Sequence, residues 1–142
     1  MPRKLPALTA DTAPFWQGGA TGALLIHHCP ACARYFHPPA PICPVCAASE
    51  VAPRAVSGRG TVMSFTINQQ AWTPELAEPF VIAIVELAEQ PGLRLLSNVV
   101  DCEVSAVQIG MAVQVRFEQH EDVWLPLFTP TDVIQANQGA AA

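Results

Sequence analysis

The sequence predicts a mainly β fold, and three observations support this prediction. Two CxxC pairs lie close together in the first third of the chain. From residue 61 onward, short segments either alternate between apolar and polar residues or run apolar, with turns containing glycine or proline between them. No segment shows the apolar period of a helix of ordinary length. The expected order is a short N-terminal helix, a cysteine-stapled ribbon and a five-stranded barrel.

The four paired cysteines, Cys29, Cys32, Cys43 and Cys46, carry the strongest single signal. A tight turn brings the two thiolates of each pair to one side of the backbone, and two such turns supply four sulfurs. Zn²⁺ binds four thiolates tetrahedrally at about 2.3 Å. Because no position is then left for water or substrate, we expect a structural zinc in a rubredoxin-like ribbon. Free buried thiols, disulfides, and an iron or redox site are the alternatives.

Composition limits the classes of protein that fit. The chain has 142 residues, of which 51% are hydrophobic and 13% charged, which suits one ordinary domain or two small modules. The net charge of −5 and the seven scattered basic residues disfavour nucleic-acid binding. No apolar run resembles a signal peptide or reaches the ~20 residues of a membrane span. An odd number of cysteines, five, fits a reducing cytoplasm, and Cys102 fits a small apolar filler better than a nucleophile.

Residues 1–22 are expected to form an arm and a short helix. Asp11 or Thr12 can cap this helix, which carries the adjacent aromatics Phe15 and Trp16. Two large aromatic side chains on so short a segment pack either on their own domain or on a partner protein. Both readings are open from the sequence.

Residues 23–53 are expected to form the ribbon, with a short strand around Tyr35 between the cysteine pairs. His27, His28 and His37 lie near the cysteines in the sequence. Since four thiolates complete a zinc shell, we expect these histidines at the surface or beside the ligands rather than on the metal. A polar connection is expected to follow the second cysteine pair.

Residues 54–134 are expected to form the barrel, followed at 135–142 by a flexible tail of small and polar residues. Proline and glycine at the centre of Gln90–Leu93 predict a type II turn between two of the strands. Five strands joined by short turns favour a small closed barrel, and the OB-fold fits this pattern. Residues 101–108 are too short for the helix that OB-folds commonly carry between their third and fourth strands. The predicted strands are 61–67, 80–87, 93–100, 113–118 and 123–129.

The longest connection within the barrel, residues 68–79, contains Trp72. Loops that carry apolar side chains often form contact surfaces. We therefore expect Trp72 to contact a partner, and the alternative is that it covers the mouth of its own barrel.

A series of short motifs runs along the chain in a fixed order: Phe15 and Trp16, Leu24, the two CxxC pairs with Phe36, Pro38 and Pro39 between them and Pro44 in the second, Gly58 and Gly60, Ser64–Thr66, Pro79 and Phe80, Ile109–Val113, and Leu125–Phe128. This order of motifs resembles a family of small bacterial and archaeal proteins that pair a rubredoxin-like zinc ribbon with an OB-fold, known as domain-of-unknown-function family thirty-five. The resemblance covers roughly residues 12–130. Two positions depart from the pattern: Ala33 replaces a usual glycine, and Ala40 replaces a usual arginine.

The resemblance implies a non-catalytic subunit that scaffolds a thiolase-fold partner in a hetero-oligomer. That partner would be a thiolase, an aldolase or an acyltransferase acting on an acyl-CoA, and the chain would help to position the CoA thioester. The sequence itself shows no nucleophile–base pair or phosphate-binding loop. A nucleic-acid module and a free-standing acyl-CoA-binding protein are the alternative functions. The candidate contacts to partner or CoA are Phe15, Trp16, Arg54, Arg59 and Trp72.

Overall fold

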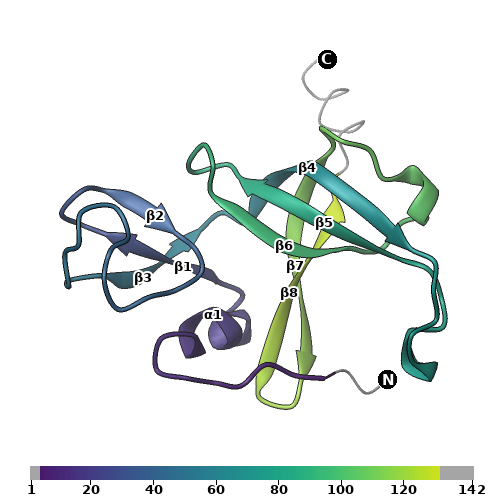
Figure 1. The fold of residues 1–142 in the computed structure, drawn as a ribbon, viewed down its shortest axis with the longest axis horizontal. Coiled ribbons are helices and arrows are strands. Elements are labelled where there is room, and N and C mark those ends of the chain that lie inside the picture. The colour runs from purple at the N-terminus through teal and green to yellow at the C-terminus, as the bar shows by residue number, and fades with distance from the viewer. Residues whose placement is uncertain (1–3, 132–142) are drawn as a thin grey trace.

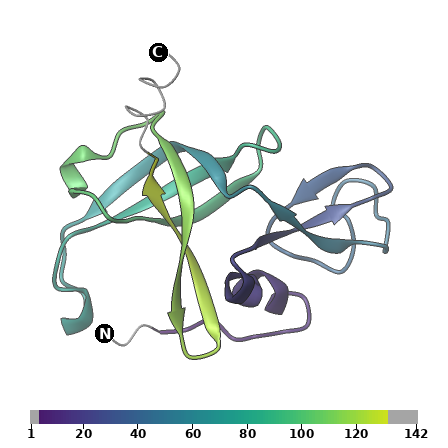
Figure 2. The same ribbon diagram turned by 180° about the vertical axis from the view of Figure 1, so that it is seen from behind.

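The computed structural model describes residues 4–131, which form two β modules side by side (Figures 1 and 2). The tail expected at residues 135–142 lies outside the described residues. A small three-stranded sheet forms one module, and a closed barrel of five strands forms the other. The predicted fold class, a short helix followed by a ribbon and an OB-fold barrel, is confirmed. In chain order the elements are α1 Ala13–Gln17, η1 Gly18–Thr21, β1 Leu24–Cys29, β2 Arg34–Phe36, β3 Ala52–Val56, β4 Arg59–Asn68, η2 Pro74–Leu76, β5 Phe80–Leu87, β6 Arg94–Val99, η3 Val104–Ala106, β7 Ala112–His120 and β8 Val123–Pro130.

The ribbon sheet has the order β2-β1-β3, and the central strand β1 pairs antiparallel with both neighbours. The expectation of a mere polar connection after Cys46 is wrong, because this stretch contains β3. Four of its five residues are exposed and one is Pro53, so it shows no apolar alternation. Pairing with β1 imposes the extended conformation, and an edge strand tolerates a proline that cannot donate to a ladder.

The barrel closes in the order β4-β5-β6-β8-β7, with a short antiparallel pairing between β4 and β7. A bulge between Val62 and Ser64 lets the long strand β4 curve so that it pairs with both β5 and β7. Gly60 is needed at the closing corner, because a Cβ there would lie 2.6 Å from Val85 Cγ1 and 2.8 Å from the carbonyl oxygen of Glu86. As expected, only the single turn η3 stands between the third and fourth barrel strands.

One core joins the barrel to the N-terminal helix. Val62, Val85, Val113 and Phe128 of the barrel are completely buried. Phe15 of α1 packs into the same core, where α1 lies against β8 and β1. No helix among residues 4–131 is long and apolar enough to cross a membrane.

The tip of the β5–β6 hairpin fastens the ribbon to the barrel. Gln90 Oε1 accepts a hydrogen bond from the Tyr35 N–H, and Gln90 Nε2 donates one to the Tyr35 carbonyl, both at 2.9 Å. The Ser57 N–H donates to the carboxylate of Glu89 at 2.7 Å. A turn places Gln90 in this position: Gly92 has φ +82°, and the Leu93 N–H donates to the Gln90 carbonyl at 3.2 Å.

Candidate metal centre and contact surfaces

Two knuckles of the same backbone shape carry the cysteine pairs. Cys29 ends β1, and the chain reverses so that β2 can pair with β1. The residue after each pair adopts the left-handed conformation, with φ 60° at Ala33 and φ 64° at Ala47. Alanine is strained in this region whereas glycine is not, so each of these two alanines costs some conformational energy.

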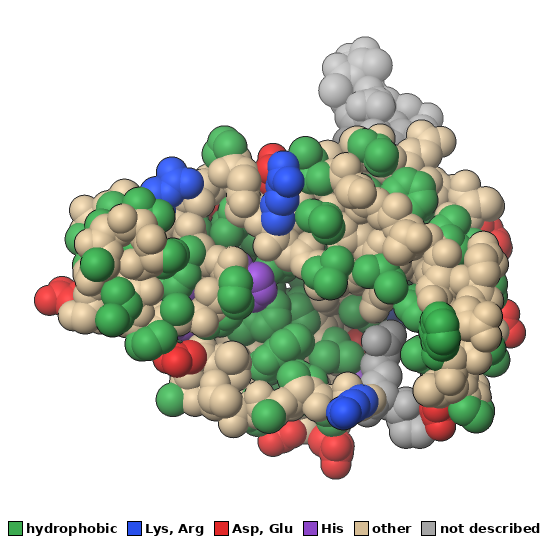
Figure 3. Space-filling model, viewed as in Figure 1, with side chains coloured by type: hydrophobic (Ala, Val, Ile, Leu, Met, Phe, Trp, Pro, Cys, Tyr) green, Lys and Arg blue, Asp and Glu red, His purple; other side chains and the backbone are tan. Residues whose placement is uncertain are grey.

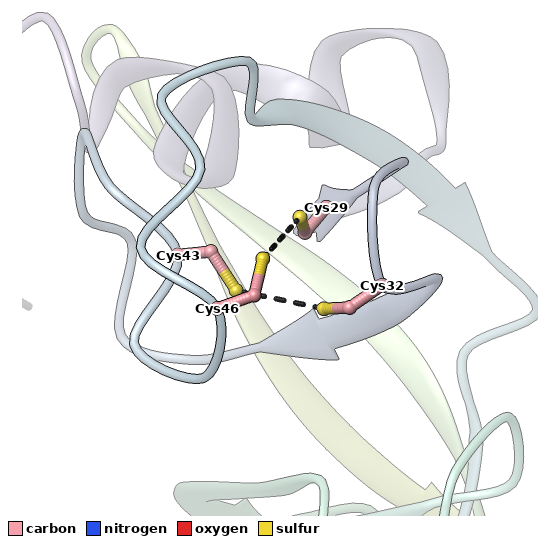
Figure 4. Close-up of side chains that lie close together, drawn as sticks. All are labelled: Cys29, Cys32, Cys43 and Cys46. Carbon is pink, nitrogen blue, oxygen red and sulfur yellow. Dashed lines mark hydrogen bonds between the residues drawn. The ribbon is translucent and has the colours of Figure 1, made fainter.

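The four cysteine sulfurs face one another across the space between the knuckles (Figure 4). The Sγ atoms of Cys29 and Cys46 are 3.5 Å apart, those of Cys32 and Cys43 are 3.7 Å apart, and all four lie within 4.8 Å of one another. A tetrahedron with metal–sulfur bonds of about 2.3 Å has edges of about 3.8 Å. A disulfide would need about 2.05 Å. The sulfurs are therefore positioned to bind one metal ion.

The pKa values of the cysteine thiols also favour binding of a metal cation at this cluster. Backbone N–H groups of Cys46 and Val45 lower the pKa of the Cys43 thiol to about 6. Loss of hydration and the neighbouring thiols raise the pKa of Cys32 to about 12. Four crowded thiols cannot all ionise without compensation, and a bound metal ion supplies the missing positive charge. Cys102 lies apart from the cluster, and burial raises the pKa of its thiol.

The three nearby histidines form a second layer of the ribbon rather than part of the metal cluster. His27 is buried against Phe36 and therefore does not take the surface position, which was one of the two that the sequence left open. His28 packs on Tyr35. His37 packs on Phe15, and its Nδ1 atom is buried with no hydrogen-bond partner among residues 4–131. Burial lowers the pKa of both His27 and His37, to about 4 for His37.

The structure separates the two aromatic residues of α1. Phe15 is only 6% exposed and belongs to the core, whereas Trp16 is partly exposed and meets Phe15 edge to face at 4.8 Å. Both aromatic side chains line a hollow beside the barrel, and Trp16 is the more exposed of the two.

Trp72 stands out from the barrel on the loop that connects β4 to β5. Its side chain is 72% exposed, and its indole N–H donates to Asn68 Oδ1 at 2.9 Å. Farther along the same loop, a hollow of about 310 Å³ is lined by residues 75–80 and by the end of β6. Arg54 and Arg59 are exposed on β3 and β4, on either side of the Ser57–Gly58 link.

Two features of the surface have no counterpart in the sequence analysis. The role of Gln90 as a bridge to Tyr35 depends on atoms 55 positions apart in the chain. Leu96 has a 73% exposed side chain in the middle of β6, although its neighbours Leu95 and Val99 are buried. The alternation of buried and exposed positions along β6 could have indicated that Leu96 faces outward. The neighbouring residues in the sequence do not show which part of the molecule lies beside that outward face.

Fold and site together define a two-module protein in which a four-cysteine metal ribbon is attached to an OB-fold barrel. The model of the ChsH2 rubredoxin-like zinc ribbon domain matches residues 16–52, and the model of the ChsH2 C-terminal OB-fold domain matches residues 53–118. The chain belongs to this ChsH2 family, which is also the DUF35 family expected from the sequence marks.

Three similar proteins illustrate the family. The probable enoyl-CoA hydratase alpha subunit of Thermomonospora curvata is 33% identical over 90% of this chain and 40% of its own length. The 3-oxo-4,17-pregnadiene-20-carboxyl-CoA hydratase alpha subunit of Mycobacterium tuberculosis is 34% identical over 89% of this chain and 40% of its own length. The chain thus spans about 40% of these curated relatives. A chain of the Ltp2-ChsH2(DUF35) aldolase superposes with a TM-score of 0.79 and 32% identity, covering 89% of this chain and 98% of that one.

Proposed function

We propose that this protein is a non-catalytic, zinc-binding subunit of a thiolase-type acyl-CoA enzyme complex. The observation that carries the proposal is the similarity over nearly the whole of the ChsH2(DUF35) chain, a protein whose solved structure is named as part of an aldolase with Ltp2. The two hydratase alpha subunits, both named for CoA thioesters, point to the same class of substrate. The partner would have the thiolase fold, would carry the chemistry and would act as a thiolase, aldolase or acyltransferase in the cytoplasm.

The metal in this proposal is a structural zinc. Thiolate ligands in a tetrahedral arrangement select zinc or iron, and the ribbon belongs to a zinc-ribbon family. Four protein ligands fill the coordination shell, so the metal holds the ribbon in shape and has no position for substrate.

The contact surface in this proposal combines exposed aromatic and basic side chains. Trp72 is the largest exposed hydrophobic side chain of the loop, and tryptophan is enriched at the centres of protein interfaces. Trp16, supported by Phe15, offers a second aromatic contact on the other side of the barrel. Arg54 and Arg59 are exposed and would meet partner carboxylates or the phosphates of CoA, helping to position the thioester.

The test is co-purification with a thiolase-fold protein from the same organism, followed by activity assays with and without this chain. We expect a stable complex with zinc bound to this subunit, and a partner that loses at least about tenfold in kcat/KM when the subunit is omitted. Trp72→Ala should weaken the complex, while Ile109→Ala, which removes another exposed apolar side chain, should not. Full activity of the partner alone would refute the proposal.

A further inference from the structure

A groove with a hydrophobic floor runs between the ribbon, α1 and the barrel (Figure 3). Its barrel half, a hollow of about 160 Å³, is lined by the aromatic pair of α1, by residues 95–98 of β6 and by residues 125–127 of β8. A second hollow of about 270 Å³ lies between β2 and the tip of the β5–β6 hairpin, and its barrel wall includes Leu93 and Arg94. The linings of the two hollows follow one another along β6, from Leu93 and Arg94 in one to residues 95–98 in the other.

The seam between β6 and β8 is open beside this groove. The two parallel strands share one bridge, Val99 with Phe128, and the Val100 N–H donates to the Phe128 carbonyl at 2.8 Å. The next donor on β8 in a parallel ladder would belong to Pro126, which has no N–H. The carbonyl of Pro126 accepts instead from Ser97 Oγ at 2.7 Å. A proline therefore stops the ladder, and in the described part of the chain the first half of β6 has no strand partner on this side.

The backbone of β6 directs hydrogen-bonding groups into the open seam. Antiparallel pairs alternate between hydrogen-bonded and non-bonded, and the Leu87 N–H donates to the Leu93 carbonyl at 2.8 Å. Hydrogen-bonded pairs recur at every second residue, so the next one after Leu87 and Leu93 joins Val85 to Leu95. The N–H and C=O groups of Arg94 and Leu96, on either side of Leu95, therefore point away from β5. Within residues 4–131, no strand pairs with this edge of β6 before its end.

The other strand edge at the groove is already covered. The outer edge of β2 has its Tyr35 N–H and C=O bonded by the side chain of Gln90. Among the described residues, 4–131, nothing covers the edge of β6 in this way, and an uncovered strand edge is a template for pairing with another chain. An added strand forms backbone hydrogen bonds with such an edge, and hydrophobic walls beside the edge provide pockets for its side chains.

Charge indicates what kind of segment fits. The chain has a net charge of −5 and seven basic residues, and two of these, Arg34 and Arg94, line the ribbon half of the groove. Arg34 is exposed. Arg94 Nε lies 3.2 Å from Glu86 Oε1, and a guanidinium group carries further N–H donors on its two terminal nitrogens. The groove is thus basic at one end and apolar at the other.

We propose that an extended segment of the partner subunit adds as a strand to β6 at residues 94–96. Its apolar side chains fill the hollow beside Trp16, and a carboxylate at its other end meets Arg34 and Arg94. This inference rests on the proposed function, because it names the surface of this chain that receives the partner.

The decisive variant is Leu96→Pro, since it removes an N–H that faces the seam and none that bonds to β5. Leu96→Ala is the matched control, because it shortens the same side chain and keeps the N–H. With the full chain and its purified thiolase-fold partner, we expect Leu96→Pro to raise Kd at least about tenfold above that of Leu96→Ala. We also expect the Leu96 amide to exchange more slowly in the complex. Arg34→Glu, which leaves the strand edge intact, should raise Kd as well.

A second arm does not depend on the partner. A phage-displayed library of twelve-residue peptides is selected on the full chain and counter-selected on Leu96→Pro. We expect enriched peptides to alternate apolar residues and to carry Asp or Glu near one end. Enrichment that is independent of Leu96 would overturn the inference, as would concentration-dependent dimers of this chain that Leu96→Pro abolishes.

The two proposals fail separately. If the thiolase-fold partner binds wild type and Leu96→Pro equally, the strand-accepting edge is wrong and the proposed function stands. If no thiolase-fold protein binds but peptides that depend on Leu96 are enriched, the proposed function is wrong and the edge still accepts a strand.

Discussion

Gln90→Ala should loosen the ribbon from the barrel. The substitution removes two hydrogen bonds of 2.9 Å and leaves both the N–H and the C=O of Tyr35 without their protein partner. Each unmade bond to a partly buried group costs on the order of 1 kcal/mol, so we expect a loss of about 2 kcal/mol in the free energy of unfolding. Gln90→Glu should cost more, because a second carboxylate oxygen would face the Tyr35 carbonyl instead of a donor.

The assay is urea unfolding of the metal-loaded protein, followed by circular dichroism and by exchange of the Tyr35 amide. Gln108→Ala is the matched control, because Gln108 is an exposed glutamine of another loop. We expect the Tyr35 amide to exchange faster in Gln90→Ala and at the wild-type rate in the control. Equal unfolding free energies and equal Tyr35 exchange in the two variants would refute the reasoning that this amide fastens the ribbon.

Three further predictions follow from the ribbon. Cys29→Ser should release the metal and unfold at least the ribbon, while Cys102→Ser should retain it; elemental analysis with circular dichroism checks both, and a folded ribbon without metal would contradict the metal assignment. His37 has a pKa of about 4 in the fold, against 6.5 for an ordinary histidine, so the unfolded chain binds a proton at this residue before the folded chain does. The free energy of unfolding is therefore unaffected by this group above pH 6.5, and it falls by up to about 3 kcal/mol as the pH drops toward 4. His37→Gln should make the free energy of unfolding less dependent on pH between 6.5 and 4 than it is in wild type. Parallel stability–pH curves for the two proteins would disprove this role of His37. Ala33→Gly should raise the unfolding free energy by about 1 kcal/mol in urea titrations, since it relieves a left-handed alanine, and a loss of stability would count against that explanation.

Much of the metal site was predictable because its information is local. The two CxxC spacings alone place thiolates in pairs, and the structure brings Cys29, Cys32, Cys43 and Cys46 within 4.8 Å of one another. The helix around Phe15 and the type II turn before Leu93 also depend on a few neighbouring residues. Local conformational preferences act over such short distances, so a sequence pattern records them directly.

The parts that escaped prediction depend on long-range pairing. β3 has exposed side chains and a proline, and it is a strand only because β1 lies beside it. His27 is polar yet buried, since the ribbon folds over it. Strand β8 pairs with β7 along its whole length but with β6 only at Phe128, and Pro126 ends that ladder only because β6 is its neighbour.

The sequence by itself determined the class of this protein: a cysteine-stapled ribbon, a short helix and a β barrel. Cysteine spacing, apolar alternation and turn residues are properties of neighbours in the chain, and they suffice for that conclusion. Only the tertiary structure decided how the two modules are joined and which surface is left open. The amide of Gln90 reaches Tyr35 across 55 positions, and the free edge at Leu96 exists because the barrel brings a proline opposite it. Such contacts are set by barrel closure, which no short stretch of the chain encodes.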